Sequence, residues 1–339
     1  MSGIVLDTAG AGMGGAARWL TELDAFLNSA QVPIRVTGRG RRLTAGWLAQ
    51  RERLAAGRDM AVAANNVSFG LAGEQRRVLL RNALHFLYPS EAETLQRMPR
   101  SFHAQLRIVR TLARRAHVIV VPCSAMAARV AHHLPSASDR IVVRAHPVTP
   151  AGERRPADQP FILIPVLPAP YKNLMSQMRA LLVATARAGR PWRLLVTAQP
   201  ADLPEDLAHD RRITPLGMVG QFEMAELWRS ATAAFFPSAL ESFGYPLAEA
   251  RVYGVPVLSP DTGQSREIAG PALLAYDPDK TDSLAAAVER VDDPVPPQPH
   301  AFDRDAYFHW LFQVAPKTHY PAVVCINDHQ SGRNALTSQ

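Results

Sequence analysis

Residues 235–250 read Phe-Phe-Pro-Ser-Ala-Leu-Glu-Ser-Phe-Gly-Tyr-Pro-Leu-Ala-Glu-Ala, an apolar strand followed by a loop and a helix. Gly244 permits a tight turn, and Pro246 suits the first helical position, where its missing N–H is no loss. A helix start offers unpaired N–H groups that can bind a diphosphate. Glu241 and Glu249 flank this position, and their carboxylates can accept hydrogen bonds from sugar hydroxyls. The stretch therefore predicts a ligand site at a strand end.

Short apolar runs alternate with helical patterns along the rest of the chain. This alternation predicts parallel α/β units, and 339 residues exceed the usual size of one hydrophobic core. The stretch from Thr149 to Pro160 is polar, contains proline and lacks apolar periodicity, which is typical of a domain boundary. We therefore predict an α/β fold of two doubly wound, Rossmann-like domains. Their sheets should present their carboxyl ends to each other across a ligand-binding cleft.

The predicted divisions are residues 1–150 for an N-terminal acceptor-binding domain, 151–300 for a C-terminal donor-binding domain, 301–315 for a closing helix and 316–339 for a loose tail. The tail is separated because its periodicity is weak. The clearest predicted elements are strands at 60–63 and 118–121 and helices at 105–116 and 174–187.

The composition, with 47% apolar and 20% charged residues, is that of a folded protein. The formal charge of +7 and a pI near 9.8 suit anionic partners. Nucleic acid is not expected, because the arginines are scattered without a recognition motif; peripheral contact with an anionic membrane stays open. The chain has no membrane-spanning apolar run, no signal-peptide pattern at its start, and a Cys123 that should be buried. We expect a cytoplasmic location. The sequence makes no prediction about the oligomeric state.

Lysine occurs only at positions 172, 280 and 317, so arginine is the usual cation of this chain. Lys172 directly follows a predicted strand, in Pro170-Tyr-Lys-Asn-Leu174. Its compact ammonium differs from a planar guanidinium, which favours a specific role over an arbitrary surface position. A solvated residue near a helix start is the alternative.

A glycine-rich stretch, Gly10-Ala-Gly-Met-Gly-Gly-Ala-Ala-Arg18, lies between the first predicted strand and helix. Glycines let the backbone approach an anion closely at a helix start. The same string fits a dinucleotide fingerprint, and Arg39, Arg41 and Arg42 after the second strand would suit a 2′-phosphate. This stretch alone does not separate the two interpretations.

The second half of the sequence resembles the retaining glycosyltransferases of the GT-B fold, family 4 (group 1), over most of residues 161–315. The resemblance rests on two glutamates separated by seven residues, with Pro237-Ser238 before them and Gly254-Val-Pro-Val257 after them. It implies that Glu241, with Ser242, Phe243 and Gly244, holds the donor sugar. It also implies that Glu249 binds the ribose of the nucleotide.

The same resemblance implies roles for residues outside this stretch. Lys172 with Asn173 would neutralise the donor diphosphate, although Leu167 stands where many members carry an arginine. The loop with Gly12, Gly14 and Gly15 would cover the diphosphate from the opposite domain. His85 would be the acceptor-domain histidine near the reacting sugar carbon, and a structural, hydrogen-bonded histidine is equally open.

The activity implied is transfer of a sugar from a nucleotide-diphosphate-sugar to a hydroxyl acceptor, with retention of anomeric configuration and without a metal or other cofactor. The catalytic candidates are Glu241, Lys172 and His85, and no ligand pattern for zinc or a divalent ion is found. One alternative is an NAD(P)-dependent oxidoreductase that uses the N-terminal glycine loop. The other is a sugar-nucleotide-binding protein with weakened catalysis. Glu249 and Lys172 should be partly exposed in the empty site.

Overall fold

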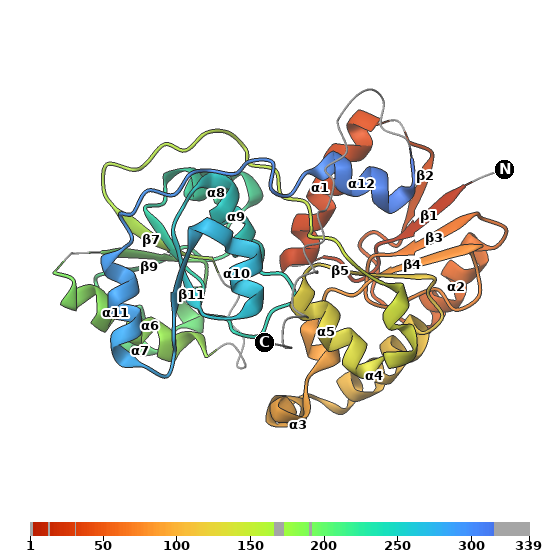
Figure 1. Ribbon diagram of the computed structural model, residues 1–339, viewed down its shortest axis with the longest axis horizontal. Coiled ribbons are helices and arrows are strands. Elements are labelled where there is room, and N and C mark those ends of the chain that lie inside the picture. The colour runs from red at the N-terminus through yellow and green to blue at the C-terminus, as the bar shows by residue number, and fades with distance from the viewer. Residues whose placement is uncertain (1–2, 13, 31, 166–172, 190–191, 315–339) are drawn as a thin grey trace, which may run out of the picture.

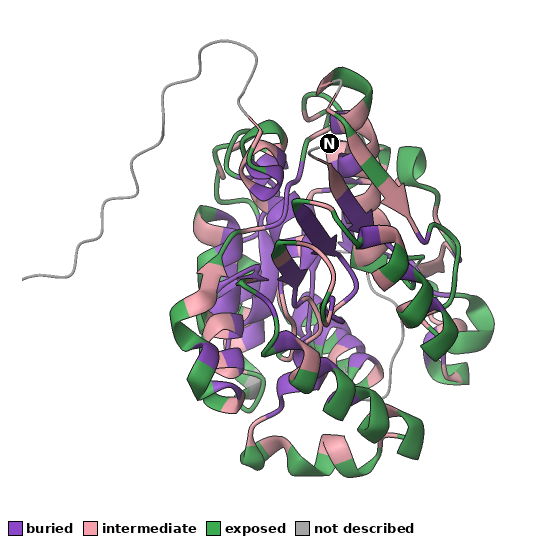
Figure 2. Cartoon of the chain, turned by 90° about the vertical axis from the view of Figure 1, so that its right-hand side faces the viewer, coloured by how far each residue is buried: buried purple, intermediate pink, exposed green. Residues whose placement is uncertain are grey.

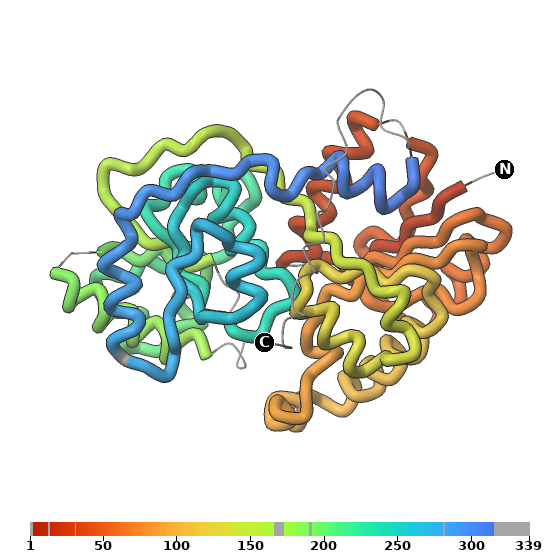
Figure 3. Tube along the Cα trace, viewed as in Figure 1, coloured from red at the N-terminus to blue at the C-terminus, as the bar shows by residue number. Residues whose placement is uncertain are grey.

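The computed structural model describes residues 3–12, 14–30, 32–165, 173–189 and 192–314. Two α/β domains lie side by side, each around its own parallel sheet (Figure 1). The tube in Figure 3 shows that the chain crosses between them twice, because the segment after the second domain returns to the first. Within these residues, no helix has both the length and the apolarity needed to cross a membrane.

The first sheet has six parallel strands among the described residues, in the order β2-β1-β3-β4-β5-β6. The strands are β1 (Ile4–Asp7), β2 (Ile34–Thr37), β3 (Met60–Ala63), β4 (Gln75–Leu79), β5 (Val118–Val121) and β6 (Ile141–Val143). Ile4 pairs with Ile34 on one side and Met60 on the other, so the order of strands reverses at β1. Loops at such a reversal point leave the sheet in opposite directions, which makes room for a ligand.

The second sheet, in the described part of the chain, also has six parallel strands, ordered β12-β11-β10-β7-β8-β9. The strands are β7 (Phe161–Ile164), β8 (Arg193–Val196), β9 (Ile213–Pro215), β10 (Ala233–Phe235), β11 (Val257–Pro260) and β12 (Leu273–Tyr276). Its reversal point lies between β7 and β10, the strand that leads into the segment with both glutamates. The two sheets confirm the predicted fold class.

Helices cover both sheets, and the buried residues concentrate in the strands and on the inward helix faces (Figure 2). The first domain contains α1 (Gly14–Ala30), α2 (Ala45–Ala55), α3 (Ala92–Gln96), α4 (Arg100–Ala113) and α5 (Ser124–His133). The second contains α6 (Leu174–Arg187), α7 (Glu205–Ala208), α8 (Gln221–Ser230), α9 (Tyr245–Tyr253), α10 (Gly263–Ala269) and α11 (Thr281–Glu289). The last helix, α12 (Arg304–Phe312), follows the second crossing.

A buried carboxylate, that of Asp7, lies at the carboxyl end of β1. One oxygen accepts hydrogen bonds from Arg51 Nη1 at 2.7 Å and Asn65 Nδ2 at 2.8 Å. The other accepts from Trp47 Nε1 and the Ala9 amide, both at 3.0 Å. Four donors therefore satisfy this buried charge and fix the first residues of the glycine loop to α2 and to the segment after β3.

Helix α12 packs on α1 and completes the core of the first domain. Phe308 is fully buried, with ring centroids 5.3 Å from Trp19 and 5.1 Å from Phe26. Trp19 Nε1 also donates to the Tyr307 hydroxyl at 3.2 Å. Arg77 of β4 donates to the carbonyl oxygens of Trp310 and Leu311, at 3.0 and 3.1 Å, and so caps the end of α12. The C-terminal helix is thus a structural part of the first domain.

Phe308→Ala should destabilise the protein by about 3–5 kcal/mol, because it removes a buried ring and leaves a cavity. The matched control is Phe222→Ala on α8, where the same ring is 82% exposed and its loss should cost less than about 0.5 kcal/mol. Urea unfolding followed by fluorescence and circular dichroism measures both variants. Equal unfolding midpoints for the two would contradict this packing of α12.

Candidate functional site

The segment after β10 turns sharply into α9 at Gly244. Gly244 is the N-cap, with φ of 73°, and a Cβ there would lie 3.0 Å from Gln264 Nε2. Glycine is therefore required both by backbone conformation and by space. Tyr245 is the first residue of α9 and Pro246 the second, one position later than predicted, because the cap residue is Gly244 itself.

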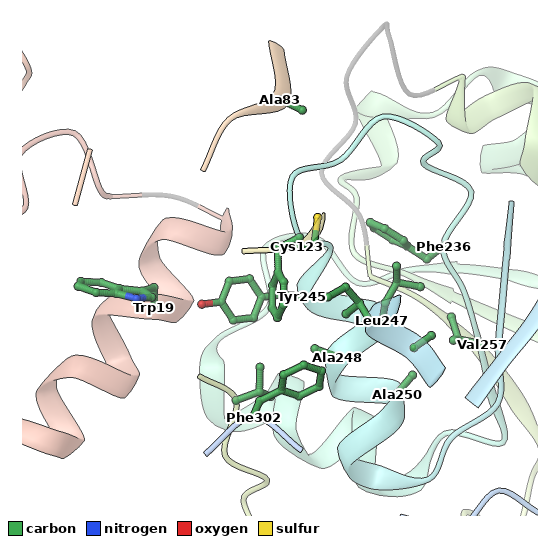
Figure 4. Close-up of a cluster of buried hydrophobic side chains, with 14 of the residues drawn as sticks. Trp19, Ala83, Cys123, Phe236, Tyr245, Leu247, Ala248, Ala250, Val257 and Phe302 are labelled. Carbon is green, nitrogen blue, oxygen red and sulfur yellow. The ribbon is translucent and has the colours of Figure 1, made fainter. Parts of the chain in front are cut away.

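This segment contacts three loops of the first domain. The Ser242 hydroxyl donates to the Arg81 carbonyl oxygen at 2.7 Å, and the thiol of the buried Cys123 donates to the Ser242 carbonyl oxygen at 3.1 Å. A Cβ at Gly15 would lie 2.9 Å from the ring of Tyr245. These partners follow β1, β4 and β5, so the carboxyl ends of both sheets face each other as predicted. Figure 4 shows Tyr245 reaching from α9 toward α1, with Cys123 beside it.

Glu249 is buried, with 9% of its surface exposed, and not partly exposed as the sequence led us to expect. The reason is Arg18 of α1, whose Nε donates to Glu249 Oε1 across the domain boundary at 3.2 Å. Burial raises the pKa of Glu249, and the guanidinium of Arg18 opposes that rise. Burial alone would lower the pKa of Arg18, but Glu249 and Glu22 raise it above its ordinary value. Each charge therefore favours the ionised form of the other.

Near Glu241, the side chain of Phe243 is packed inside the protein and leaves only its backbone available to a ligand. Glu241 is half-buried in the loop between β10 and α9. The ring of Phe243 is buried, 5.7 Å from Phe302 and 5.0 Å from His146 between centroids. Because its side chain is packed inside the protein, Phe243 can offer a ligand only its backbone groups.

The other predicted donor-site residues lie around the same strand ends. Gly12 belongs to the loop between β1 and α1, Gly14 is the first residue of α1, and a Cβ at Gly12 would meet no atom within 4 Å. Packing therefore does not explain a glycine at position 12. Asn173 is the N-cap of α6, with φ of 48°. Lys172 and Leu167 lie outside the described residues.

His85 is buried in a 3₁₀ turn at Ala83–Phe86, where its ring stacks on Phe102 of α4 at 5.4 Å between centroids. Burial, helped by the charge of Arg110, lowers the pKa of His85 to about 4. The imidazole is therefore neutral at physiological pH. The described contacts support a packing role, and its role in catalysis stays a prediction.

His146, which the sequence left without a role, lies directly against the glutamate-containing segment. Its buried ring stacks on Tyr245 at 5.9 Å between centroids, and burial lowers its pKa well below the usual range. Arg18 was also given no role. His146 closely follows β6, and this position near a strand end was the signal that could have identified it, whereas Arg18 lies inside α1 and carried no such signal.

The His85 environment predicts a pH-dependent stability. The unfolded chain binds a proton at this histidine near pH 6.5, whereas the folded chain does so near pH 4. Stability from this group is complete above pH 6.5 and falls by about 1.4 kcal/mol per unit as pH drops between the two pKa values. His85→Phe should remove this part of the slope in urea unfolding from pH 7 to 4.5. His300→Phe, at an exposed histidine, is the control, and an unchanged slope in His85→Phe would refute the assignment.

Comparison with known proteins shows what the second domain is similar to. Residues 166–292 match the family model described as glycosyl transferases group 1. An O-antigen chain mannosyltransferase B from Escherichia coli is 34% identical over 73 residues, which is 22% of this chain and 19% of that protein. The matched part is therefore about a fifth of the relative's length.

Solved structures extend the similarity to the whole fold. The apo lipopolysaccharide outer core galactosyltransferase WaaB superposes with a TM-score of 0.59 at 16% identity, covering 92% of this chain and 99% of that one. A UDP-GlcNAc 2-epimerase from Methanocaldococcus jannaschii gives a TM-score of 0.56 at 13% identity, covering 92% and 99%. At such identities the similarity shows the fold alone. The chain therefore has the GT-B fold, and its residues 166–292 are similar to the glycosyl transferases of group 1.

Proposed function

We propose that this protein transfers a sugar from a nucleotide-diphosphate-sugar to a hydroxyl acceptor, with retention of anomeric configuration and without a divalent metal. The main observation is that the glycine loop before α1 and the start of α9 are in contact across the two domains, at Gly15 and Tyr245. Both are helix starts, whose free N–H groups favour an anion such as a diphosphate. The group 1 match supplies the class of reaction.

The proposed roles follow from the chemistry of each group. Glu249 accepts hydrogen bonds from the ribose, and Glu241 accepts them from hydroxyls of the donor sugar. Lys172 and the α9 start stabilise the negative charge that develops on the departing diphosphate. The acceptor oxygen forms the new bond to the anomeric carbon as the bond between that carbon and the phosphate oxygen breaks. The departing phosphate oxygen takes the proton of the acceptor hydroxyl. No separate general base is then needed.

An oxidoreductase that uses the same glycine loop is less well supported. Two of the three arginines that would hold a 2′-phosphate make contacts within the protein: Arg39 pairs with Asp24, and the guanidinium of Arg41 lies 5.0 Å from the centre of the Trp47 ring. A sugar-nucleotide-binding protein with weakened catalysis would share the donor site and differ only in turnover.

We also propose that the first domain docks on an anionic membrane surface. Residues 94–138 contain seven arginines and neither Asp nor Glu, so this stretch accounts for the entire net charge of +7. Arg100, His103 and Arg107 are exposed along α4 at helical spacing, and Ile108 beside them is 44% exposed. A cationic helix face with an apolar side chain fits anionic lipid head groups.

Transfer should proceed in excess EDTA with a donor chosen by thermal-shift screening of UDP-, GDP-, ADP- and dTDP-sugars. NMR of the product should show the donor's anomeric configuration. Glu241→Gln should lower turnover more than nucleotide affinity, and Lys172→Ala should weaken diphosphate binding by roughly 1.5–3 kcal/mol. Activity that EDTA abolishes and Mg²⁺ restores, an inverted product, or epimerised donor without transfer would each exclude this mechanism.

Vesicles that contain phosphatidylglycerol should bind the protein more strongly than neutral phosphatidylcholine vesicles, and added salt should weaken the binding. The double variant Arg100→Glu/Arg107→Glu should lose at least about ten-fold in affinity, since each basic residue near the surface contributes about 1 kcal/mol. Arg35→Glu/Arg42→Glu makes the same charge change at other exposed positions. Equal losses in both double variants would show a nonspecific charge effect and reject α4 as the docking face.

A further inference from the structure

Arg18 joins three parts of the molecule that the proposed reaction requires. It lies on α1, just after the glycine loop. Its Nε donates to Glu249 Oε1 at 3.2 Å, its Nη1 to Glu22 Oε1 at 2.6 Å, and its Nη2 to the Thr149 carbonyl oxygen at 3.2 Å. Three nitrogens of one planar guanidinium thus reach three acceptors, which the single nitrogen of a lysine could not do.

Glu22 and Thr149, two of the acceptors of Arg18, are also hydrogen-bonded to each other. Glu22 is buried, and its carboxylate accepts from the Thr149 amide at 2.7 Å and from the Thr149 hydroxyl at 2.8 Å. Thr149 is therefore held through its N–H, its hydroxyl and its carbonyl oxygen. This residue lies between β6 and β7, where the chain passes from the first domain to the second. Glu249 is the member of the network that belongs to the second domain.

We propose that Arg18 is a positioning residue for donor binding: it holds the Glu249 carboxylate in its ligand-binding orientation and connects it to the interdomain segment at Thr149. The proposal rests on the proposed function, because it assigns Glu249 to the nucleotide. Glu249 belongs to the second domain, but its carboxylate is oriented only when Arg18 of the first domain contacts it.

The charges around Glu249 show why it depends on Arg18. Among the described residues, Arg18 and Glu22 of α1 and Tyr253 of α9 interact electrostatically with it, and the side chain of Trp228 on α8 also lowers its pKa. Burial raises its pKa, Glu22 adds to the rise, and Arg18 is the cation that opposes both. Without Arg18 the carboxyl group would take up a proton at a higher pH. A neutral carboxyl group accepts weaker hydrogen bonds than a carboxylate does.

The test is calorimetric binding of UDP, GDP, ADP and dTDP to the full chain from pH 6 to 8.5, using the nucleotide that the parent binds. The readout is the ratio of variant to parent Kd, in which ionisation of the nucleotide cancels. For Arg18→Gln this ratio should be roughly ten-fold or more at pH 6 and should fall as pH rises. Arg18→Lys, which keeps the charge but cannot reach all three acceptors, should restore part of the affinity at pH 6. Arg39→Gln, an exposed arginine that pairs with Asp24 of α1, is the matched control.

The alternative outcomes separate the two proposals. An Arg18→Gln ratio near one, or a ratio that is raised equally at every pH, overturns the positioning role. The Lys variant still tests the role if the Gln variant does not fold. Glu249→Gln should bind weakly with little pH dependence. If Glu249→Gln binds as the parent does, the donor-site assignment itself is wrong; if it binds weakly while Arg18→Gln does not, only the inference about Arg18 fails.

Discussion

The buried pair of Asp7 and Arg51 is the interaction on which the first domain depends. Buried charges are costly unless they are paired and hydrogen-bonded, and here the partners come from α2 and from the segments that follow β1 and β3. A Cβ at Gly38, after β2, would lie 2.5 Å from Asp7 Oδ1, so the neighbouring loop is shaped by the same carboxylate. The glycine loop begins at Gly10, three residues after Asp7. Its position relative to the second domain is therefore set from inside the first.

The contact between the domains is aromatic and basic at its centre. Burial lowers the pKa of Arg81 and raises the pKa of Tyr245 well above its usual range, so the tyrosine stays neutral. The Arg81 guanidinium lies 5.0 Å from the centre of the Trp19 ring, and the Ser124 amide at the start of α5 donates to Glu267 of α10 at 2.9 Å. At this contact the two domains are therefore packed directly against each other.

The sequence predicted local elements well where apolar periodicity was strong. The strands at 60–63 and 118–121 and the helix at 174–187 have the predicted bounds. Helix α4 begins at Arg100, five residues earlier than predicted, and α2 was missed because its buried face includes the polar Arg51. The Arg18–Glu249 pair joins residues 231 positions apart, and spacing along a chain carries no signal for such a contact. The predicted strand ends indicated the general location of the site. The contacts between its residues, such as that of Arg18 with Glu249, came only from the structure.

The two crossings between the domains run side by side, since the Val148 amide donates to the Phe302 carbonyl oxygen at 3.1 Å. Two adjacent covalent links restrict how one domain can move relative to the other. They leave rotation about a common axis but resist sliding and free twisting of one domain against the other. Because α12 anchors the second link inside the core of the first domain, any rotation of the second domain would take place about an axis that is fixed to the first.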